Sequence, residues 1–189
     1  MILTRLAVYC GANMGPDAFA KATKEVAQEI LDRDLELVYG GGCAGLMGVV
    51  AKTVLDGGGK IHGVIPKFLT ERELLLEGVD DIEIVENMSI RKQKLLEKSD
   101  ACLAIPGGPG TLEEIIEAFS WAILGQSENP CALYNVDGYY TPLEEMFDKM
   151  AEAGYITQEN RDHLFFSDNL DEIFDFFDSY KQPKIREYD

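Results

Sequence analysis

The sequence predicts an α/β fold, namely a Rossmann-like, doubly wound parallel sheet with helices on both faces. Short apolar runs rich in strand-forming residues recur along the 189-residue chain. Segments with apolar residues at helical spacing separate these runs, and this alternation is typical of parallel strands joined by crossover helices. Conspicuous turns follow three of the runs, and two of these turns are glycine-rich. They lie at the position where open α/β sheets bind their ligands.

The expected elements alternate along the chain. Strands are expected at residues 5–10, 35–40, 60–65, 81–86, 101–106 and 131–136, where β-branched, aromatic and aliphatic residues are concentrated. Helices are expected between them at 17–33, 45–56, 89–98 and 112–124, and in the C-terminal third at 142–153 and 171–180. Because the chain has no linker, repeat or low-complexity segment, we expect a single domain over residues 1–180 and a tail over 181–189.

The charge of the chain argues against polyanionic partners. Lys and Arg number 17 against 34 Asp and Glu, which gives a net charge of −17. Such a surface repels nucleic acid and anionic membranes. A small phosphate ligand stays compatible with this charge, because it needs only a local group of backbone N–H donors and one or two basic side chains.

The cysteines and histidines do not form a metal-binding pattern. The four cysteines, Cys10, Cys43, Cys102 and Cys131, are far apart in the chain, no CxxC pair occurs, and the chain has only two histidines. We interpret the cysteines in apolar runs as small buried residues of a protein in a reducing compartment. The apolar start of the chain is too short for a signal peptide, and no later run reaches the length of a membrane span, so we expect a cytoplasmic protein.

The turn GGGCAGLMG at residues 40–48 lies between an expected strand and an expected helix. Its glycines would let the backbone approach an anion while the helix N-terminus points N–H groups at it. The alternative is that the glycines only permit a tight turn. The sequence leaves both interpretations open, and the turn lacks the Lys-Ser/Thr pair of a P-loop.

The turn PGGPGTLEE at residues 106–114 is a second candidate anion site. Gly107, Gly108 and Gly110 offer a nest of N–H groups, and Thr111 is able both to cap the next helix and to bind phosphate. Thr111 and Glu114 also fit a T-x-x-E capping box, in which Glu114 would only bond the N–H at the helix start. The sequence alone does not separate this structural role from a catalytic one.

The segment NMSIRK at residues 87–92 brings two cations to the same edge of the sheet. Arg91 and Lys92 are consecutive on a helix, so their side chains diverge by about 100° and cannot both point into one pocket. One would bind and the other support it. Both could also be ordinary solvated charges of a helix surface.

The segments YGGGCAGLMG, MSIRK and PGGPGTLEE, followed by SWAILG, resemble the LONELY GUY (LOG) family of cytokinin riboside 5′-monophosphate phosphoribohydrolases. The resemblance extends from VYCGAN through GVIPKFL to YNVDGYY in the same order. It implies a Rossmann-like nucleotide-binding catalytic domain, a homodimer, no cofactor and no metal, with Arg91 and Glu114 as catalytic residues. The substrate-binding residues that it implies are Gly42, Glu73, Met88, Arg91, Lys92, Gly107, Gly108, Pro109, Gly110, Thr111, Leu112, Glu113, Glu114 and Ser120.

Three departures from the family pattern concern this same pocket. The turn after the first strand, which should line it, reads CGAN at residues 10–13 where the family often has serines. Pro109 replaces a frequent tyrosine, and Ser120 replaces a threonine while keeping the hydroxyl. Family members have also been labelled lysine decarboxylases, but that chemistry needs a lysine that forms a Schiff base with pyridoxal phosphate, and no lysine lies in a recognisable setting for it.

The residues agree with N-glycosidic hydrolysis of a nucleoside 5′-monophosphate, either AMP or an N6-prenylated relative. Cleavage passes through an oxocarbenium-like state that a carboxylate such as Glu114 stabilises while it activates water. Arg91 stays protonated and takes an electrostatic or positioning role. The alternatives are a non-catalytic nucleotide sensor or carrier, in which Glu114 only caps its helix, and phosphoribosyl transfer to another acceptor.

Overall fold

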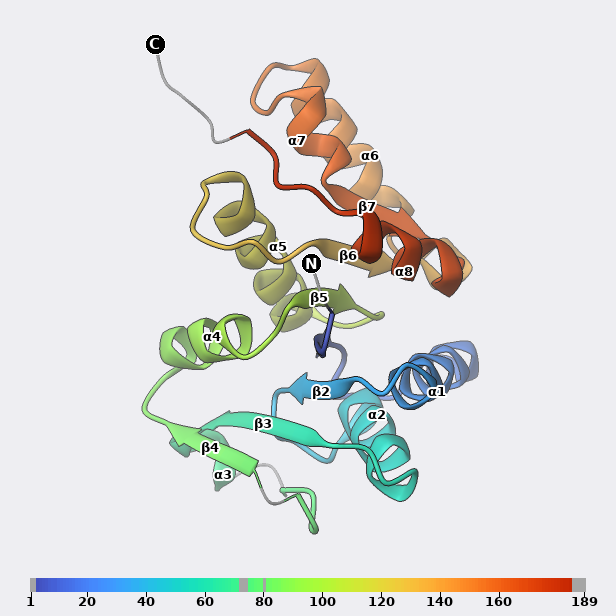
Figure 1. Cartoon of the computed structure of the whole chain (residues 1–189), viewed down its shortest axis with the longest axis vertical. Coiled ribbons are helices and arrows are strands. Elements are labelled where there is room, and N and C mark those ends of the chain that lie inside the picture. The colour runs from blue at the N-terminus through green and yellow to red at the C-terminus, as the bar shows by residue number, and fades with distance from the viewer. Residues whose placement is uncertain (1–2, 72–74, 80, 185–189) are drawn as a thin grey trace.

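The computed structural model describes residues 3–71, 75–79 and 81–184, and within them shows a parallel sheet of seven strands between two layers of helices (Figure 1). The strand order is β4-β3-β2-β1-β5-β6-β7, and every neighbouring pair is parallel. The predicted fold class is therefore confirmed. The strands are β1 (Arg5–Tyr9), β2 (Glu36–Tyr39), β3 (Ile61–Pro66), β4 (Asp81–Val85), β5 (Ala101–Ala104), β6 (Cys131–Tyr134) and β7 (Leu164–Ser167).

Helices cover both faces of the sheet, as a doubly wound fold requires. One face carries α1 (Asp17–Asp32), α2 (Gly45–Asp56) and α8 (Leu170–Ser179). The other carries α4 (Met88–Glu97), α5 (Pro109–Ile123), α6 (Thr141–Glu152) and α7 (Gln158–Asp162). Two short elements, α3 (Lys67–Thr70) and the 3-10 helix η1 (Val136–Gly138), follow β3 and β6. None of the described helices has the length and apolarity that a membrane crossing needs.

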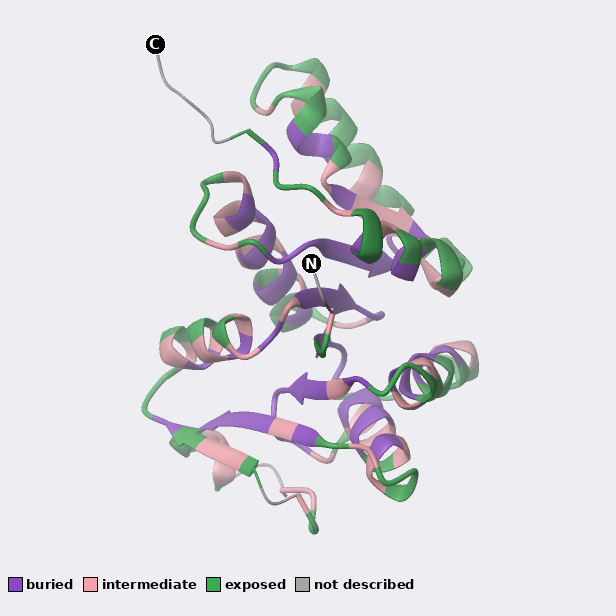
Figure 2. Cartoon of the chain, in the orientation of Figure 1, coloured by how far each residue is buried: buried purple, intermediate pink, exposed green. Residues whose placement is uncertain are grey.

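The core consists of two apolar clusters, one on each face of the sheet. Side chains of a strand alternate between faces, so Leu6 and Val8 of β1 pack on the α1 side, whereas Ala7 and Tyr9 pack on the α5 side. Figure 2 shows the central strands buried and the helices exposed only on their outer sides. Burial on both faces explains why the central strands read as continuous apolar runs in the sequence.

Two of the elements that sequence patterns did not predict, β7 and α7, lie in the C-terminal part of the fold. Strand β7 has only four residues, LFFS, and lies at the edge of the sheet with two of them half-buried. Helix α7 has five residues. Such short segments give too few periods for a helix or strand pattern to emerge.

The chain changes direction across the sheet at β1. Strands β2, β3 and β4 lie on one side of β1, and β5, β6 and β7 lie on the other. A crevice opens where such a switch separates the connections that leave neighbouring strands, and this is where α/β proteins bind ligands. The turn after β1 consequently meets the turn after β5, and the N–H of Gly11 donates to the carbonyl of Pro106 at 3.2 Å.

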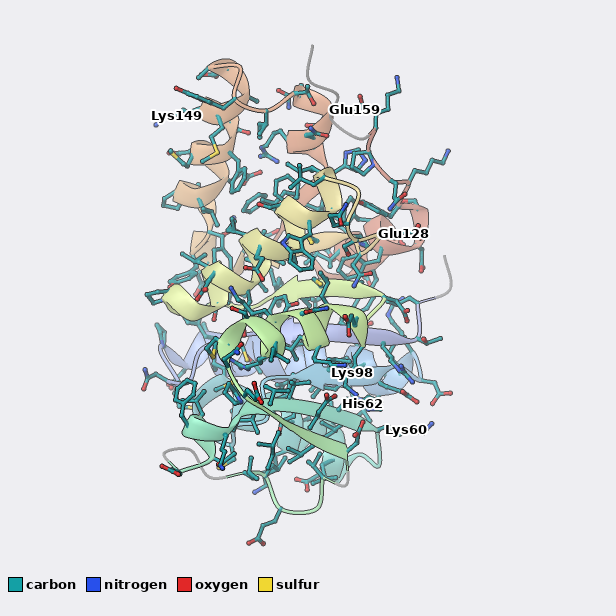
Figure 3. All side chains as sticks on the ribbon, turned by 90° about the vertical axis from the view of Figure 1, so that its left-hand side faces the viewer. Lys60, His62, Lys98, Glu128, Lys149 and Glu159 are labelled. Carbon is teal, nitrogen blue, oxygen red and sulfur yellow. The ribbon has the colours of Figure 1, made fainter. Side chains whose placement is uncertain are left out.

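Charged side chains gather at the opposite, amino-terminal edge of the sheet. Figure 3 labels Lys60, His62 and Lys98 in this region. Lys60 Nζ donates to Glu36 at 2.9 Å, and Nε2 of His62 lies 2.8 Å from the same carboxylate. Nδ1 of His62 contacts Asp81 on β4. The cluster therefore links β2, β3 and the edge strand β4.

Replacement of Glu36 by glutamine is expected to reduce stability at neutral pH but not in strong acid. Hydrogen bonds from Lys60, His62 and Arg5 lower the pKa of Glu36 from 4.5 to about 2. A lowered pKa stabilises the fold above the ordinary value, and this contribution disappears as the pH falls from 4.5 to about 2. Solvent screening limits the difference to about 1 kcal/mol. Urea unfolding at pH 7 and pH 2.5 tests it, and equal losses at both pH values would contradict this account.

Candidate active site

A cleft of about 440 Å³ opens at the carboxyl ends of the central strands, where the connections after β1 and β5 leave toward opposite faces of the sheet. The turn after β1 forms one wall, the start of α5 forms another, and side chains from α1, α2 and α4 close the remainder. The lining residues include Cys10, Gly11, Asn13, Gly40, Arg91, Gly107, Gly108, Gly110, Thr111, Glu114 and Tyr139.

Arg91 reaches the cleft from the first turn of α4. The side chain of Asn87 caps this helix by accepting from the N–H of Ile90 at 3.0 Å. Arg91 lies one turn into the helix and is buried. Its Nε donates to the carbonyl of Val64 near the end of β3, at 3.1 Å, which fixes the guanidinium over the sheet edge.

Gly40, directly after β2, provides the space for this guanidinium. A Cβ atom at residue 40 would lie 1.9 Å from Nη2 of Arg91. The glycine is thus required by the close approach of a charged side chain, and this role is distinct from the phosphate binding for which its turn was considered.

A Gly40→Ala variant is expected to displace Arg91, with a loss of about 1–3 kcal/mol in the free energy of unfolding. Catalytic activity that depends on Arg91 should fall with it, because the guanidinium loses the position in which the Val64 carbonyl holds it. Denaturant unfolding and product assays measure the two effects. In Gly40→Ala/Arg91→Lys the smaller head group relieves the contact, so stability should recover while activity does not. Full activity in the single variant would contradict this explanation.

Glu114 lies one turn into α5 and faces Arg91. Its side chain is only 9% exposed, and Oε1 is 3.2 Å from Nη1 of Arg91. Within the described residues this oxygen accepts no hydrogen bond of good geometry, although it is buried. Burial raises the pKa of Glu114, and the Arg91 charge partly opposes the shift. A buried carboxylate with an unused lone pair and a raised pKa is typical of catalytic sites.

The capping-box interpretation of Glu114 is wrong. Helix α5 begins at Pro109, three residues before the expected start, and its N-cap is Gly108, with no side-chain cap. Proline at the first helical position has its φ already set for a helix, which explains the earlier start. Thr111 is therefore inside the helix, so it cannot be the cap that Glu114 would complete. Glu114 therefore takes no part in a capping box.

The two glycine-rich turns differ in whether their helix N-terminus is free. At α2 the N–H groups of Leu46 and Met47 both donate to the carbonyl of Gly11, at 3.0 and 3.3 Å. This turn is therefore joined to the turn after β1, and these two N–H groups are not available to an anion. At α5, the N–H groups of Gly110 and Thr111 have no acceptor in the described part of the chain, and both residues line the cleft. Of the two helix N-termini, that of α5 is thus the one with N–H groups available to an anion.

Comparison with known proteins identifies the family. Residues 47–177 match the sequence model of a family described as "possible lysine decarboxylase". A probable cytokinin riboside 5′-monophosphate phosphoribohydrolase of Oryza sativa subsp. japonica is 44% identical over 93% of this chain and 79% of that protein. A cytokinin riboside 5′-monophosphate phosphoribohydrolase of Arabidopsis thaliana is 40% identical over 93% of this chain and 82% of that protein. The chain belongs to the LONELY GUY family.

Solved structures with low sequence identity share the fold of this LONELY GUY family member. The molybdenum cofactor carrier protein of Chlamydomonas reinhardtii superposes with a TM-score of 0.70 at 18% identity, covering 95% of this chain and 100% of that chain. The molybdenum cofactor binding protein of Rippkaea orientalis gives 0.69 at 17% identity, covering 95% and 98%. At this identity the likeness shows the fold alone.

The lysine decarboxylase description does not fit this LONELY GUY site. Decarboxylation of that kind needs a lysine beside pyridoxal phosphate. No lysine is among the described residues that line the cleft. Lys92, next to Arg91 in the chain, instead donates to Glu113 at 2.8 Å and Glu117 at 2.7 Å. The described residues also contain no cluster of His, Cys, Asp and Glu suited to a metal ion.

Part of the set implied by the LONELY GUY resemblance lines the cleft, namely Arg91, Gly107, Gly108, Gly110, Thr111 and Glu114. Arg91 and Lys92 diverge as the helix geometry predicts, and Lys92, which pairs with Glu113, does not line the cleft. Glu73 falls outside the described residues. The other implied residues do not line the cleft, and they are Gly42, Met88, Pro109, Leu112 and Ser120.

Sequence reasoning missed several residues of the cleft. Tyr139 reaches it from the connection between β6 and α6, and Phe19 from α1. Met14 and Leu69 add apolar surface. The motif YNVDGYY was noticed only as part of the LONELY GUY resemblance. Its density of aromatic and turn residues directly after a strand was the signal that could have placed Tyr139 at the site.

Proposed function

We propose that this chain hydrolyses the N-glycosidic bond of a nucleoside 5′-monophosphate to the free base and ribose 5-phosphate. The observation that carries the proposal is the buried carboxylate of Glu114, which accepts no hydrogen bond of good geometry from the described residues and lies 3.2 Å from Arg91 beside the free N-terminus of α5. The relatives named above are phosphoribohydrolases for cytokinin riboside 5′-monophosphates, and they support the same substrate class.

The proposed mechanism assigns one task to each part of the cleft. The 5′-phosphate binds the N–H groups of Gly110 and Thr111, where the helix dipole favours negative charge. The Glu114 carboxylate stabilises the positive charge that develops on the ribose and orients a water molecule. The bond from C1′ to the base nitrogen breaks, the water oxygen bonds to C1′, and the water proton balances the charge of the departing base. Arg91 holds Glu114 in its ionised form.

The pH dependence of the reaction follows from the raised pKa of Glu114. Because the carboxylate is the active form, kcat/KM should fall as the pH drops through this pKa, and the midpoint of the fall should lie above the ordinary value of 4.5. A pH–rate profile of base release measures it. A profile that is flat from pH 8 to pH 4.5, in a protein that stays folded by circular dichroism, would remove Glu114 from this role.

The apolar side chains around the cleft bear on the choice of base. Met14, Phe19 and Leu69 all line it, and Met14 is about half exposed. Such surface stabilises an apolar substituent by about 25 cal/mol per Å² that it buries. We propose that an N6-prenylated AMP is the preferred substrate and that unsubstituted AMP is a poorer one.

Chromatographic detection of free base tests the function directly. The purified chain is incubated with AMP and with isopentenyl-AMP, and Glu114→Gln serves as the control. Base release that depends on Glu114, with a higher kcat/KM for isopentenyl-AMP, supports the proposal and the ranking. Measurable nucleotide binding without any base release would favour the sensor or carrier alternative.

We further propose that the enzyme is a cytoplasmic homodimer. All four cysteines are free, as in a reducing compartment. Leu96 of α4 and Trp121 of α5 line a small hollow between these helices and are only partly buried. An aromatic residue in such a setting is typical of an interface. Light scattering on the purified chain measures the mass, and a mass of 21.0 kDa would show a monomer.

A further inference from the structure

In the turn between β5 and α5, the carbonyl groups of residues 105–107 accept hydrogen bonds from residues elsewhere in the chain. Each of these three consecutive carbonyls accepts a hydrogen bond from a residue outside the turn. The donors are Tyr140 Oη to Ile105 at 2.9 Å, Gly11 N to Pro106 at 3.2 Å, and Tyr139 Oη to Gly107 at 2.7 Å.

These bonds also determine where the N–H groups of the turn point. In a trans peptide the C=O of one residue and the N–H of the next point in opposite directions, and the described residues contain no cis peptide. Tyr139, by holding the carbonyl of Gly107, therefore directs the N–H of Gly108 to the opposite side. Tyr140 orients no N–H, because the residue that follows Ile105 is Pro106.

The peptide held by Tyr139 is the one most able to rotate. It joins two glycines, Gly107 and Gly108, and both residues line the cleft. Glycines on both sides permit a peptide flip at low conformational cost. A flipped peptide would point the Gly107 carbonyl oxygen at a bound anion in place of the Gly108 N–H. The hydrogen bond from Tyr139 to Gly107 therefore determines whether this peptide attracts or repels the anion.

Tyr139 is itself held at the rim of the cleft. Its ring makes edge-to-face contacts with Phe19, at a centroid distance of 5.2 Å, and with Tyr140, at 5.0 Å. The turn that presents it needs positive φ at Asp137 (52°) and Gly138 (72°). Tyr139 is 44% exposed and lines the cleft, so it lies where a ligand would reach it.

We infer that Tyr139 is a positioning residue for phosphate recognition: its hydroxyl locks the Gly107–Gly108 peptide so that the N–H of Gly108 joins those of Gly110 and Thr111 in the anion site. The inference rests on the proposed function, which places the phosphate at this helix N-terminus. The buried Glu114 carboxylate, which lines the same cleft and has an unused lone pair, independently indicates that a ligand binds here.

Calorimetric binding of AMP and adenosine tests this role in the Glu114→Gln background, where no turnover is expected. Tyr139→Phe keeps the ring and removes only the hydroxyl. It should weaken AMP binding by about tenfold, the value of one charge-assisted hydrogen bond, and leave adenosine binding within about twofold. With Glu114 intact, KM for the nucleotide should rise by a similar factor while kcat changes little.

Tyr140→Phe is the matched control, because it frees a carbonyl whose peptide has no N–H. It should lower the midpoint of thermal unfolding, since Tyr140 is 2% exposed, yet keep the preference for AMP over adenosine. Unchanged AMP binding in Tyr139→Phe, or an equal loss for both ligands, would overturn the inference. A tenfold loss for AMP alone, in a chain that never releases base, would support Tyr139 and reject the hydrolase.

Discussion

Glu114→Gln is expected to lower kcat for base release by about 10²–10⁴-fold, the range that positioned acid–base groups contribute. Glutamine has nearly the same shape as glutamate but cannot carry the negative charge that stabilises the ribosyl cation. Nucleotide binding should persist, because the proposed phosphate donors are backbone N–H groups at the start of α5. Single-turnover assays with isopentenyl-AMP and calorimetry with AMP measure the two effects separately.

The same substitution should also change how stability depends on pH. A raised pKa means that the folded chain binds the Glu114 proton more tightly than the unfolded chain does. Stability of the unmodified chain therefore falls as the pH rises from 4.5 through the folded pKa, and this fall should be absent in Glu114→Gln. The substitution also leaves the buried Arg91 without its counter-charge, which lowers stability at every pH.

Glu117→Gln is the matched control, one turn further along α5. Glu117 pairs with Lys92 and does not line the main cleft. It should retain base release. Comparable losses in both variants would mean that any charge change on α5 impairs the enzyme, and the assignment to Glu114 would then fail.

The strands that could be predicted from the sequence are those buried on both faces of the sheet, because burial on both faces requires a continuous run of apolar residues. The runs around Leu37 and Leu103 are buried on both sides and could be identified as strands from composition alone. Strand β7 lies at the edge, where two of its four residues are only half-buried. Edge burial depends on which helix happens to cover the strand, and no local pattern records that.

The sequence allowed us to predict which types of residue form the site, but it did not allow us to predict which of them contact one another. Glycines, a cation and a carboxylate at one edge of the sheet indicated an anion site with a possible base. Whether Glu114 capped its helix depended on the register of α5, which Pro109 shifted by three residues. Gly40 and Tyr139 act on Arg91 and Gly107, which are far away in the sequence. Such roles exist only after the chain has folded.

Arg91→Met is expected to destabilise the fold strongly and to abolish base release. Methionine fills much of the space beside Gly40 but leaves the Glu114 carboxylate buried without its cation. Removal of one partner from a buried ion pair costs about 3–5 kcal/mol. Without Arg91 the pKa of Glu114 should rise further, because the charge that opposes the effect of burial is gone.

The pH dependence and a double variant separate this electrostatic cause from a simple packing defect. When Arg91 is absent, the folded state takes up a proton at Glu114 more readily, so the stability lost in Arg91→Met should be smaller at pH 5 than at pH 8. Arg91→Met/Glu114→Gln buries no unpaired charge, and it should be more stable than Arg91→Met alone at pH 8. A packing defect would give the same loss at both pH values and the same loss in both variants. If the double variant recovers stability without recovering activity, then the ion pair belongs to the chemistry of the site, because the fold alone can do without it.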